Sequence, residues 1–144
     1  MKKSLMLALA AFLALPAAAD SLSDEHNVNR EVVAQADPGA KELLLRRSTL
    51  SRGQTFTLPV NLTAGKVYTF YGDCDDRCTN IDMTLSQNGR VVAQDVLDDP
   101  QPLFSYRATR SGTYTVKVPM LACGTTRCAL SVHVFEGSKM VYGN

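Results

Sequence analysis

Apolar and polar side chains alternate in short segments along most of this chain, beginning at about residue 43. Residues 55–62 show the alternation most clearly, because every second side chain is apolar. The apolar positions of this segment are Phe56, Leu58, Val60 and Leu62. A period of two residues predicts a β-strand with one face in a core and the other toward solvent. Pro59 lies inside the run, which favours an edge strand or a bulge because proline cannot donate to a β-ladder.

Similar segments follow at short intervals, separated by residues typical of turns. Further strands are predicted at residues 67–72, 81–85, 91–93, 103–108, 113–118 and 130–134. Asn88-Gly89 stands between two of these segments and is a strong signal for a two-residue hairpin turn. About seven or eight short strands, with no helix among them, predict an all-β fold in the form of an antiparallel β-sandwich.

The first 19 residues have the three parts of a secretory signal peptide. Lys2 and Lys3 provide positive charge, residues 5–15 form an uncharged apolar run, and small residues follow Pro16. The run is too short to span a membrane, which takes about 20 residues. We therefore expect cleavage after Ala19, no transmembrane segment after cleavage, and a periplasmic or secreted mature protein.

The mature chain is expected to consist of an N-terminal segment, residues 20–42, and a β-sandwich domain, residues 43–144. Ser23 is a suitable helix cap, and residues 37–39 form a stop signal, so a short helix ending near Gln35 is predicted. The segment lacks a strong apolar face. It is expected to be a linker or a loosely docked helix, with disorder as the alternative.

The chain contains four cysteines, an even number that predicts two disulfides in an exported protein. They are Cys74, Cys78, Cys123 and Cys128. Several pairings are open, and we favour the two local pairs, Cys74–Cys78 and Cys123–Cys128, because each spans a short polar loop. Zinc ligation by four thiolates is the alternative, which an oxidising compartment disfavours. Such short loops remove little chain entropy, so the bridges are expected to shape loops more than to add global stability.

The charge balance gives no sign of a nucleic-acid or anionic-membrane partner. Of the 15 Lys and Arg residues, Lys2 and Lys3 belong to the predicted signal peptide, which leaves 13 against 14 Asp and Glu. The mature chain is nearly neutral, and it has no basic stripe with interleaved aromatic residues.

Several short motifs occur in order between residues 52 and 137. They are Gly72-Asp73-Cys74-Asp75, Asp82-Met83-Thr84-Leu85, Asn88-Gly89, Asp95 and Ser111-Gly112-Thr113-Tyr114. In this order and spacing they resemble the bacterial pre-peptidase C-terminal (PPC) domain family, in particular a cysteine-bearing subgroup of small secreted proteins. The resemblance implies a jelly-roll-like β-sandwich and a non-catalytic module of the kind that accompanies secreted peptidases. The family has two aspartates around the third strand, whereas this chain has Asn80 and Asp82 there.

The residues offer no catalytic set. A nucleophilic site needs a general base, and the two histidines are His26 and His133. His26 lies in the N-terminal segment, where no fixed geometry is expected, and we interpret His133 as a surface or sheet-face residue of a strand. The chain has no catalytic or nucleotide-binding fingerprint, and no Trp to line the cleft of a glycosidase. We therefore expect a protein that is not an enzyme and needs no organic cofactor.

Acidic side chains cluster in two predicted loops and on the strand between them. They are Asp73, Asp75, Asp76, Asp82, Asp95, Asp98 and Asp99. Calcium takes about six to eight oxygen ligands, so these carboxylates are candidate calcium ligands if the two loops meet at one end of the sandwich. The alternative is that the aspartates serve as turn residues that hydrogen-bond their own backbone.

Three functions are open on these grounds. The first is a binding or accessory module of the cell envelope, whose partner is an unidentified envelope or extracellular macromolecule. The second is a calcium-stabilised structural or adhesion domain, and the third is a small secreted enzyme or an enzyme inhibitor. We favour the first because it requires no catalytic residues and agrees with the resemblance, although a fold alone does not fix a function.

Overall fold

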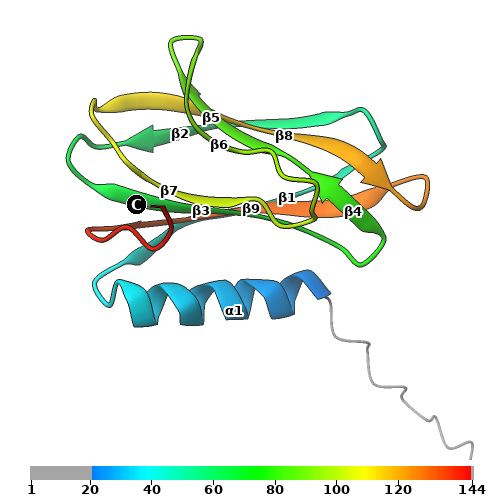
Figure 1. Ribbon diagram of the computed structural model, residues 1–144, viewed down its shortest axis with the longest axis horizontal. Coiled ribbons are helices and arrows are strands. Elements are labelled where there is room, and N and C mark those ends of the chain that lie inside the picture. The colour runs from blue at the N-terminus through cyan, green and yellow to red at the C-terminus, as the bar shows by residue number, and fades with distance from the viewer. Residues whose placement is uncertain (1–20, 144) are drawn as a thin grey trace, which may run out of the picture.

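The computed structural model describes residues 21–143, which form one helix and nine β-strands (Figure 1). The predicted signal peptide, residues 1–19, lies outside the described residues. In chain order the elements are α1 (Ser21–Ala36), β1 (Lys41–Leu50), β2 (Thr55–Leu62), β3 (Val67–Cys74), β4 (Cys78–Ile81), β5 (Met83–Gln87), β6 (Arg90–Asp95), β7 (Leu103–Arg107), β8 (Gly112–Cys123) and β9 (Cys128–Gly137). The structure thus adds β1 and β4 to the strands that the alternation singles out.

The strands form two antiparallel sheets packed as a β-sandwich, which confirms the predicted fold class. Sheet A has the strand order β1-β9-β3-β7. Sheet B has the order β2-β8-β5-β6, and the short strand β4 pairs with the end of β8. The first and last strands of the sandwich, β1 and β9, are therefore neighbours in sheet A.

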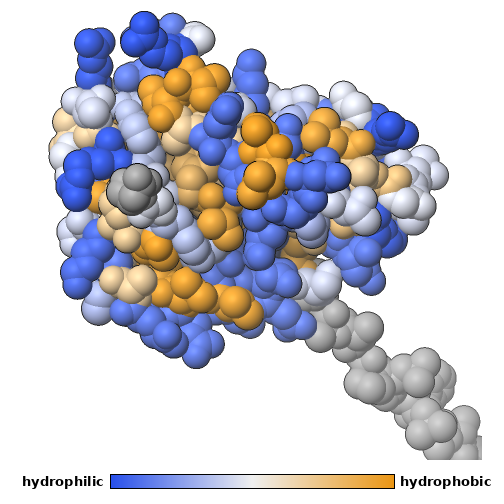
Figure 2. Space-filling view, viewed as in Figure 1, coloured by the Kyte–Doolittle hydropathy of each residue, from blue (hydrophilic) through white to orange (hydrophobic). Residues whose placement is uncertain are grey.

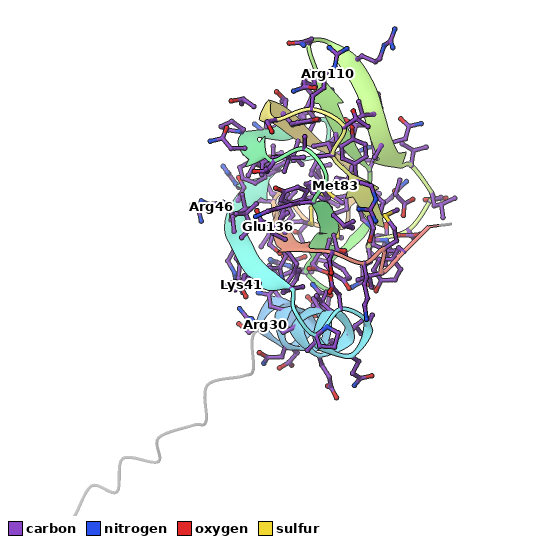
Figure 3. The ribbon with its side chains drawn as sticks, turned by 90° about the vertical axis from the view of Figure 1, so that its left-hand side faces the viewer. Arg30, Lys41, Arg46, Met83, Arg110 and Glu136 are labelled. Carbon is purple, nitrogen blue, oxygen red and sulfur yellow. A yellow bond between two sulfur atoms is a disulfide. The ribbon has the colours of Figure 1, made fainter. Side chains whose placement is uncertain are left out.

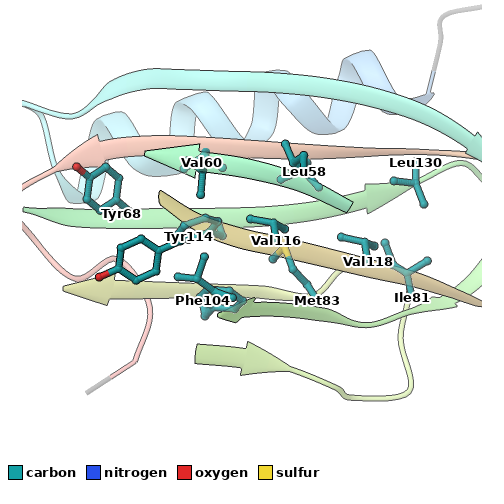
Figure 4. Close-up of a cluster of buried hydrophobic side chains, with 14 of the residues drawn as sticks. Leu58, Val60, Tyr68, Ile81, Met83, Phe104, Tyr114, Val116, Val118 and Leu130 are labelled. Atoms are coloured by element: carbon teal, nitrogen blue, oxygen red, sulfur yellow. The ribbon is translucent and has the colours of Figure 1, made fainter. Parts of the chain in front are cut away.

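The core lies between the two sheets and is built largely from alternate residues of the longer strands (Figure 4). In β8 the inward residues Tyr114, Val116 and Val118 are fully buried and alternate with more exposed ones, as the sequence predicts. Ile81 and Met83 reach the same core from β4 and β5. Each fully buried side chain of this size stabilises the fold by about 1.5–3 kcal/mol, so this layer supplies most of the hydrophobic stabilisation.

Two turn and edge features also follow their sequence signals. Asn88 and Gly89 have φ angles of 51° and 76°, the left-handed pair that a type I′ turn requires, and they join β5 to β6 in a hairpin. Pro59 lies in β2, an edge strand of sheet B. The missing amide proton of this proline therefore costs little, because one side of the strand has no neighbour.

Two disulfides join Cys74 to Cys78 and Cys123 to Cys128, the pairing that the sequence favours. The first links the end of β3 in sheet A to β4, which pairs with sheet B. The second links the end of β8 in sheet B to the start of β9 in sheet A. Cys78 and Cys123 are register partners, so the bridges lie side by side and clamp the two sheets together at one end of the sandwich.

The outer face of sheet A is covered by two segments of the same chain (Figure 1). Helix α1 lies against β3 and β9. The segment after β9 also returns over the sheet, where the hydroxyls of Tyr71 and Tyr142 are 2.9 Å apart and Ser105 accepts the amide of Val141 at 3.0 Å. The structure differs here from the loosely docked N-terminal segment expected from the sequence, because polar contacts described below extend a short apolar face. Within residues 21–143, no helix is long and apolar enough to cross a membrane.

Gly137, at the end of β9, lies against the turn that joins α1 to β1. A methyl group on Gly137 would overlap the carboxylate of Asp37. That carboxylate is held in place, because it accepts hydrogen bonds from the amides of Ser138 at 2.8 Å and Lys139 at 3.0 Å. Burial opposes the charge of Asp37, but these hydrogen bonds outweigh it and lower the pKa of the carboxyl.

We predict that Gly137→Ala lowers the free energy of unfolding by about 1–3 kcal/mol, because either the new methyl or the Asp37 carboxylate must move. Urea titration followed by circular dichroism measures the change. Gly39→Ala is the matched control, since an added methyl there meets nothing within 4 Å. It should alter the free energy of unfolding by less than about 0.5 kcal/mol. Equal effects of the two substitutions would contradict the prediction.

Candidate functional site

A buried layer of polar side chains lies between α1 and the outer face of sheet A. His26 and Asn29 are on the buried side of α1, while Ser131 of β9 and Asp73 of β3 are register partners in the sheet. His26 Nε2 lies 2.6 Å from Ser131 Oγ, and Asn29 Nδ2 donates to Asp73 Oδ2 at 2.8 Å. Buried polar groups cost stability unless they are paired, so these contacts fix the position of the helix.

His133 of β9 lies next to His26 in the same layer. The two rings are 5.3 Å apart in an edge-to-face arrangement, and His133 is 0% exposed. Its Nε2 is 3.2 Å from Glu42 Oε2 without the alignment of a hydrogen bond, and neither ring nitrogen has a hydrogen-bond partner among the described residues. Burial lowers the pKa of His133, and Glu42 offsets only part of that effect, so the ring is neutral at pH 7.

These two histidines correct the sequence interpretation in part. His133 is a sheet-face residue, as expected, but it is not on the surface, because α1 covers it. His26 has a defined geometry rather than none, and it is 3% exposed. The sequence did not reveal either burial. His26 lies among polar residues, and His133 alternates with the inward residues Val132 and Val134, which places it on the strand face that usually meets solvent.

Asp73 is the buried carboxylate of this layer. Gln101 Nε2 donates to Asp73 Oδ1 at 2.9 Å and to Glu25 Oε2 at 3.2 Å, which links the loop before β7 to the helix. Burial raises the pKa of Asp73, and the hydrogen bonds from Gln101 and Asn29 offset part of the shift. Asp73 therefore serves as an acceptor that two amide side chains satisfy.

Ser131 and His26 are the residue types of a nucleophile and a general base, but a substrate cannot reach them. Both side chains are buried, and neither lines the grooves described below. A catalytic serine must reach its substrate, so in this arrangement the Ser131–His26 contact serves to dock α1.

The candidate calcium ligands fall into separate roles. Asp75 accepts hydrogen bonds from the Arg77 side chain at 2.7 Å and the Ala129 amide at 2.8 Å, and Asp76 is exposed. Burial raises the pKa of Asp82, and the nearby carboxylates add to this effect. These carboxylates are Asp95, Asp98 and Asp99. Within residues 21–143, no three His, Cys, Asp or Glu side chains are grouped to hold a metal ion. Calcium binding stays a prediction from the sequence.

A groove of about 460 Å³ lies between the β5–β6 hairpin and the loop that joins β7 to β8. The hairpin contributes Gln87, Asn88 and Arg90, and the loop side contributes Tyr106, Thr109 and Arg110. The groove is near the start of β8, whereas the disulfides are at its end. Figure 3 places Arg110 on the side of the sandwich away from α1.

The groove is positively charged. Arg90 and Arg110 are exposed, and neither makes an ion pair within the part of the chain that the structure describes. The Tyr106 ring packs edge-to-face on Tyr114 at 5.9 Å, and the Tyr114 hydroxyl donates to the carbonyl of Arg110 at 2.7 Å. The aromatic pair therefore holds the loop that carries one of the two arginines.

A second groove, of about 380 Å³, lies near the end of β9. Two of its charged residues, Lys66 and Glu136, neutralise each other in an ion pair of 2.8 Å. The groove at the hairpin is thus the better candidate for ligand binding, because its charges have no such partner.

Sequence reasoning did not single out the two arginines of the groove. Arg90 follows the turn at Asn88-Gly89, and Arg110 precedes the turn at Ser111-Gly112. Both turns are visible in the sequence, but nothing in the sequence shows that they meet at one end of the sandwich.

Comparison with a solved structure supports the β-sandwich fold. No protein-family model matches the chain, and no curated protein matches its sequence. The pre-peptidase C-terminal domain of a collagenase from Bacillus anthracis is similar in structure, with a TM-score of 0.52 and 13% identity over 63% of this chain and 87% of that chain. PliG from Aeromonas hydrophila, a periplasmic inhibitor of g-type lysozyme, gives a TM-score of 0.49 and 11% identity over 72% and 90% of the two chains. At 13% identity, the likeness to the collagenase domain shows a shared fold and nothing about activity.

We predict that Asn29→Ala lowers the free energy of unfolding by about 1–3 kcal/mol, because it leaves the buried Asp73 carboxylate with one amide donor fewer. The pKa of Asp73 should rise further, which a carbon-13 NMR titration of the carboxyl measures. Asn27→Ala is the matched control, because Asn27 is on the same helix but exposed. If the two variants gave the same stability and the same Asp73 titration, the assigned role of Asn29 would be wrong.

Proposed function

We propose that this protein is a non-catalytic binding module that works outside the cytoplasm and binds an anionic saccharide chain in the groove at the β5–β6 hairpin. The observation that carries the proposal is the pair of arginines, Arg90 and Arg110, which converge on this groove without an acidic partner in the described residues. Such an arrangement leaves guanidinium donors available to a ligand.

The location outside the cytoplasm is supported by the two disulfides. Each disulfide joins strands of different sheets and so has a structural role. Structural disulfides persist in oxidising compartments rather than in the cytosol. A signal peptide at residues 1–19 agrees with this location, and it stays a prediction from the sequence.

A binding role without catalysis is supported by where the reactive residue types lie. Both histidines and Ser131 are committed to the contact between α1 and sheet A. The polar groups that line the groove are guanidinium, amide, hydroxyl and phenol groups, and the lining includes no histidine, aspartate or glutamate to serve as a general base. These groups are suited to recognition by hydrogen bonds.

The chemistry of the groove favours a carboxylated sugar as the ligand class. A guanidinium group binds a carboxylate through two parallel hydrogen bonds, and the groove has two such groups. The side chains of Gln87, Asn88 and Thr109 both donate and accept, which suits sugar hydroxyls, and the ring of Tyr106 offers an aromatic surface. On the face shown in Figure 2, apolar residues form small patches among hydrophilic ones, so no broad apolar surface there competes as a binding face.

We predict that the purified exported protein binds an oligogalacturonate more tightly than a neutral cello-oligosaccharide, as measured by isothermal titration calorimetry. Arg90→Gln with Arg110→Gln should weaken oligogalacturonate binding at least about tenfold, because a hydrogen bond to a charged group is worth about 1.5–3 kcal/mol. Arg46→Gln with Arg52→Gln is the matched control, since it removes the same charge from exposed positions outside the groove lining.

The control pair should leave affinity within about twofold of the unmodified protein at physiological salt, where distant surface charges are screened. Equal loss in both pairs would show a response to net charge and would contradict the groove as the site. Equal affinity for the acidic and neutral sugars would contradict the ligand class.

A further inference from the structure

Helix α1 is held to the sandwich by polar as well as apolar contacts. Its buried residues are Leu22, His26, Asn29 and Val33, so only half of them are apolar. A helix that covers a protein core usually presents a continuous apolar stripe, and burial of that stripe gives most of its docking energy. The docking of α1 therefore depends strongly on the state of the polar side chains beneath it.

His133 is the most sensitive of these side chains. Its ring is 0% exposed, lies 4.4 Å from the ring of Phe135 and 5.3 Å from that of His26, and has no hydrogen-bond partner among the described residues. A proton added to this ring creates a charge that the apolar and histidine neighbours do not solvate. The charge becomes hydrated only when the helix moves away.

We propose that α1 is an acid-releasable cover on the outer face of sheet A, and that protonation of His133 beneath it is the trigger. At neutral pH the helix is docked as the structure shows. At mildly acidic pH it detaches as a unit while the two-sheet sandwich stays folded.

The charged and titratable groups around His133 come from every element packed against it. Helix α1 contributes His26, Arg30 and Glu25, and Gln101 hydrogen-bonds to Glu25. Strand β1 contributes Glu42 and Arg47. Strand β3 contributes Tyr71 and Asp73. Glu42 is the one carboxylate at 3.2 Å from the His133 ring, but it already pairs with Arg30 at 2.7 Å. A charged His133 would thus share one carboxylate with a guanidinium.

The direction of the pH effect follows from the two states of His133. Burial lowers the pKa of His133 in the docked state, whereas the exposed ring has its ordinary value of 6.5. The docked state therefore binds fewer protons, and its advantage is complete above about pH 6.5 and falls as the pH drops toward the lowered value. Arg30 first, and His133 to a smaller extent, lower the pKa of Glu42, so that group stays charged in this range.

Asp73 acts in the opposite direction. Burial raises its pKa, so docking favours its protonated form and gains as the pH falls through that raised value from above. Burial also raises the pKa of Tyr71 well above its usual range, so Tyr71 stays neutral throughout. Release is therefore expected as the pH falls below about 6.5, and Asp73 opposes release as its carboxyl takes up a proton.

The connection between helix and sheet permits release without unfolding. The turn after α1 is anchored to the other end of the chain, because Asp37 accepts the amides of Ser138 and Lys139. The core between the sheets contains no residue of α1, and the disulfides are outside the helix. A released helix stays tethered at Asp37, while the core and both disulfides remain as they are.

The test is hydrogen exchange of backbone amides, measured by NMR on the purified exported protein at pH 7.5, 6.5 and 5.5 and corrected for the intrinsic pH dependence of exchange. We expect the opening equilibrium of α1 amides to rise up to about fivefold between pH 6.5 and 5.5, the limit for one proton whose pKa in the released state is 6.5. Amides of β8, in the centre of sheet B, should keep their protection. In the variant His133→Gln, the change in the α1 opening equilibrium between pH 6.5 and 5.5 should fall below about twofold. His133→Phe is a second variant with the same expected result, in case the glutamine side chain disturbs packing under the helix.

Three results would overturn the proposal. The first is an opening equilibrium of α1 that does not change between pH 7.5 and 5.5. The second is a joint loss of protection in α1 and β8, which would mean unfolding of the whole domain. The third is an unchanged pH response in both His133 variants, which would place the trigger elsewhere. Asp73→Asn serves as a control, and the response just below pH 6.5 should persist in it, since Asp73 opposes release.

Discussion

Burial of β9 on both faces is the constraint on which the rest of this structure depends. The inward residues Leu130, Val132 and Val134 enter the core between the sheets, and the outward residues Ser131 and His133 are equally inaccessible. A strand that is buried on one face alone can carry polar residues on its solvent face without a desolvation cost. Both faces of β9 are buried, so its polar residues carry that cost. Helix α1 creates this burial and, through His26, supplies a partner for Ser131, so the helix and the outward face of β9 form one unit.

The molecule separates this internal polar layer from its exposed polar groove. The layer under α1 uses histidine, serine, asparagine and aspartate to fix a helix, and the groove at the hairpin presents arginines to solvent. The main difference between the two regions is whether their polar groups already have partners within the protein. Polar groups that already satisfy one another define structure, whereas charged groups without a partner define a surface that a ligand can complete.

The sequence predicts what depends on local pattern. The alternation in β2 and β8, the Asn88-Gly89 turn, the edge position of Pro59 and the local disulfides all follow from residues that are close in the chain. What the sequence does not predict depends on segments far apart meeting in space. The contact of His26 with Ser131 spans 105 positions, and a polar residue that another element will bury looks the same in sequence as one that stays hydrated.

The pairing of β1 with β9 has a consequence for the order in which the chain can fold. The first strand of the sandwich has its ladder partner in the last, and α1 docks on that same last strand. A chain that emerges from its amino end, whether from a ribosome or from a translocation channel, cannot complete sheet A until nearly all of it has emerged. Sheet B depends less on the end of the chain, because all of its strands, β8 included, come before β9. Pairings so distant along the chain slow folding, so β1 stays without its ladder partner until β9 is available.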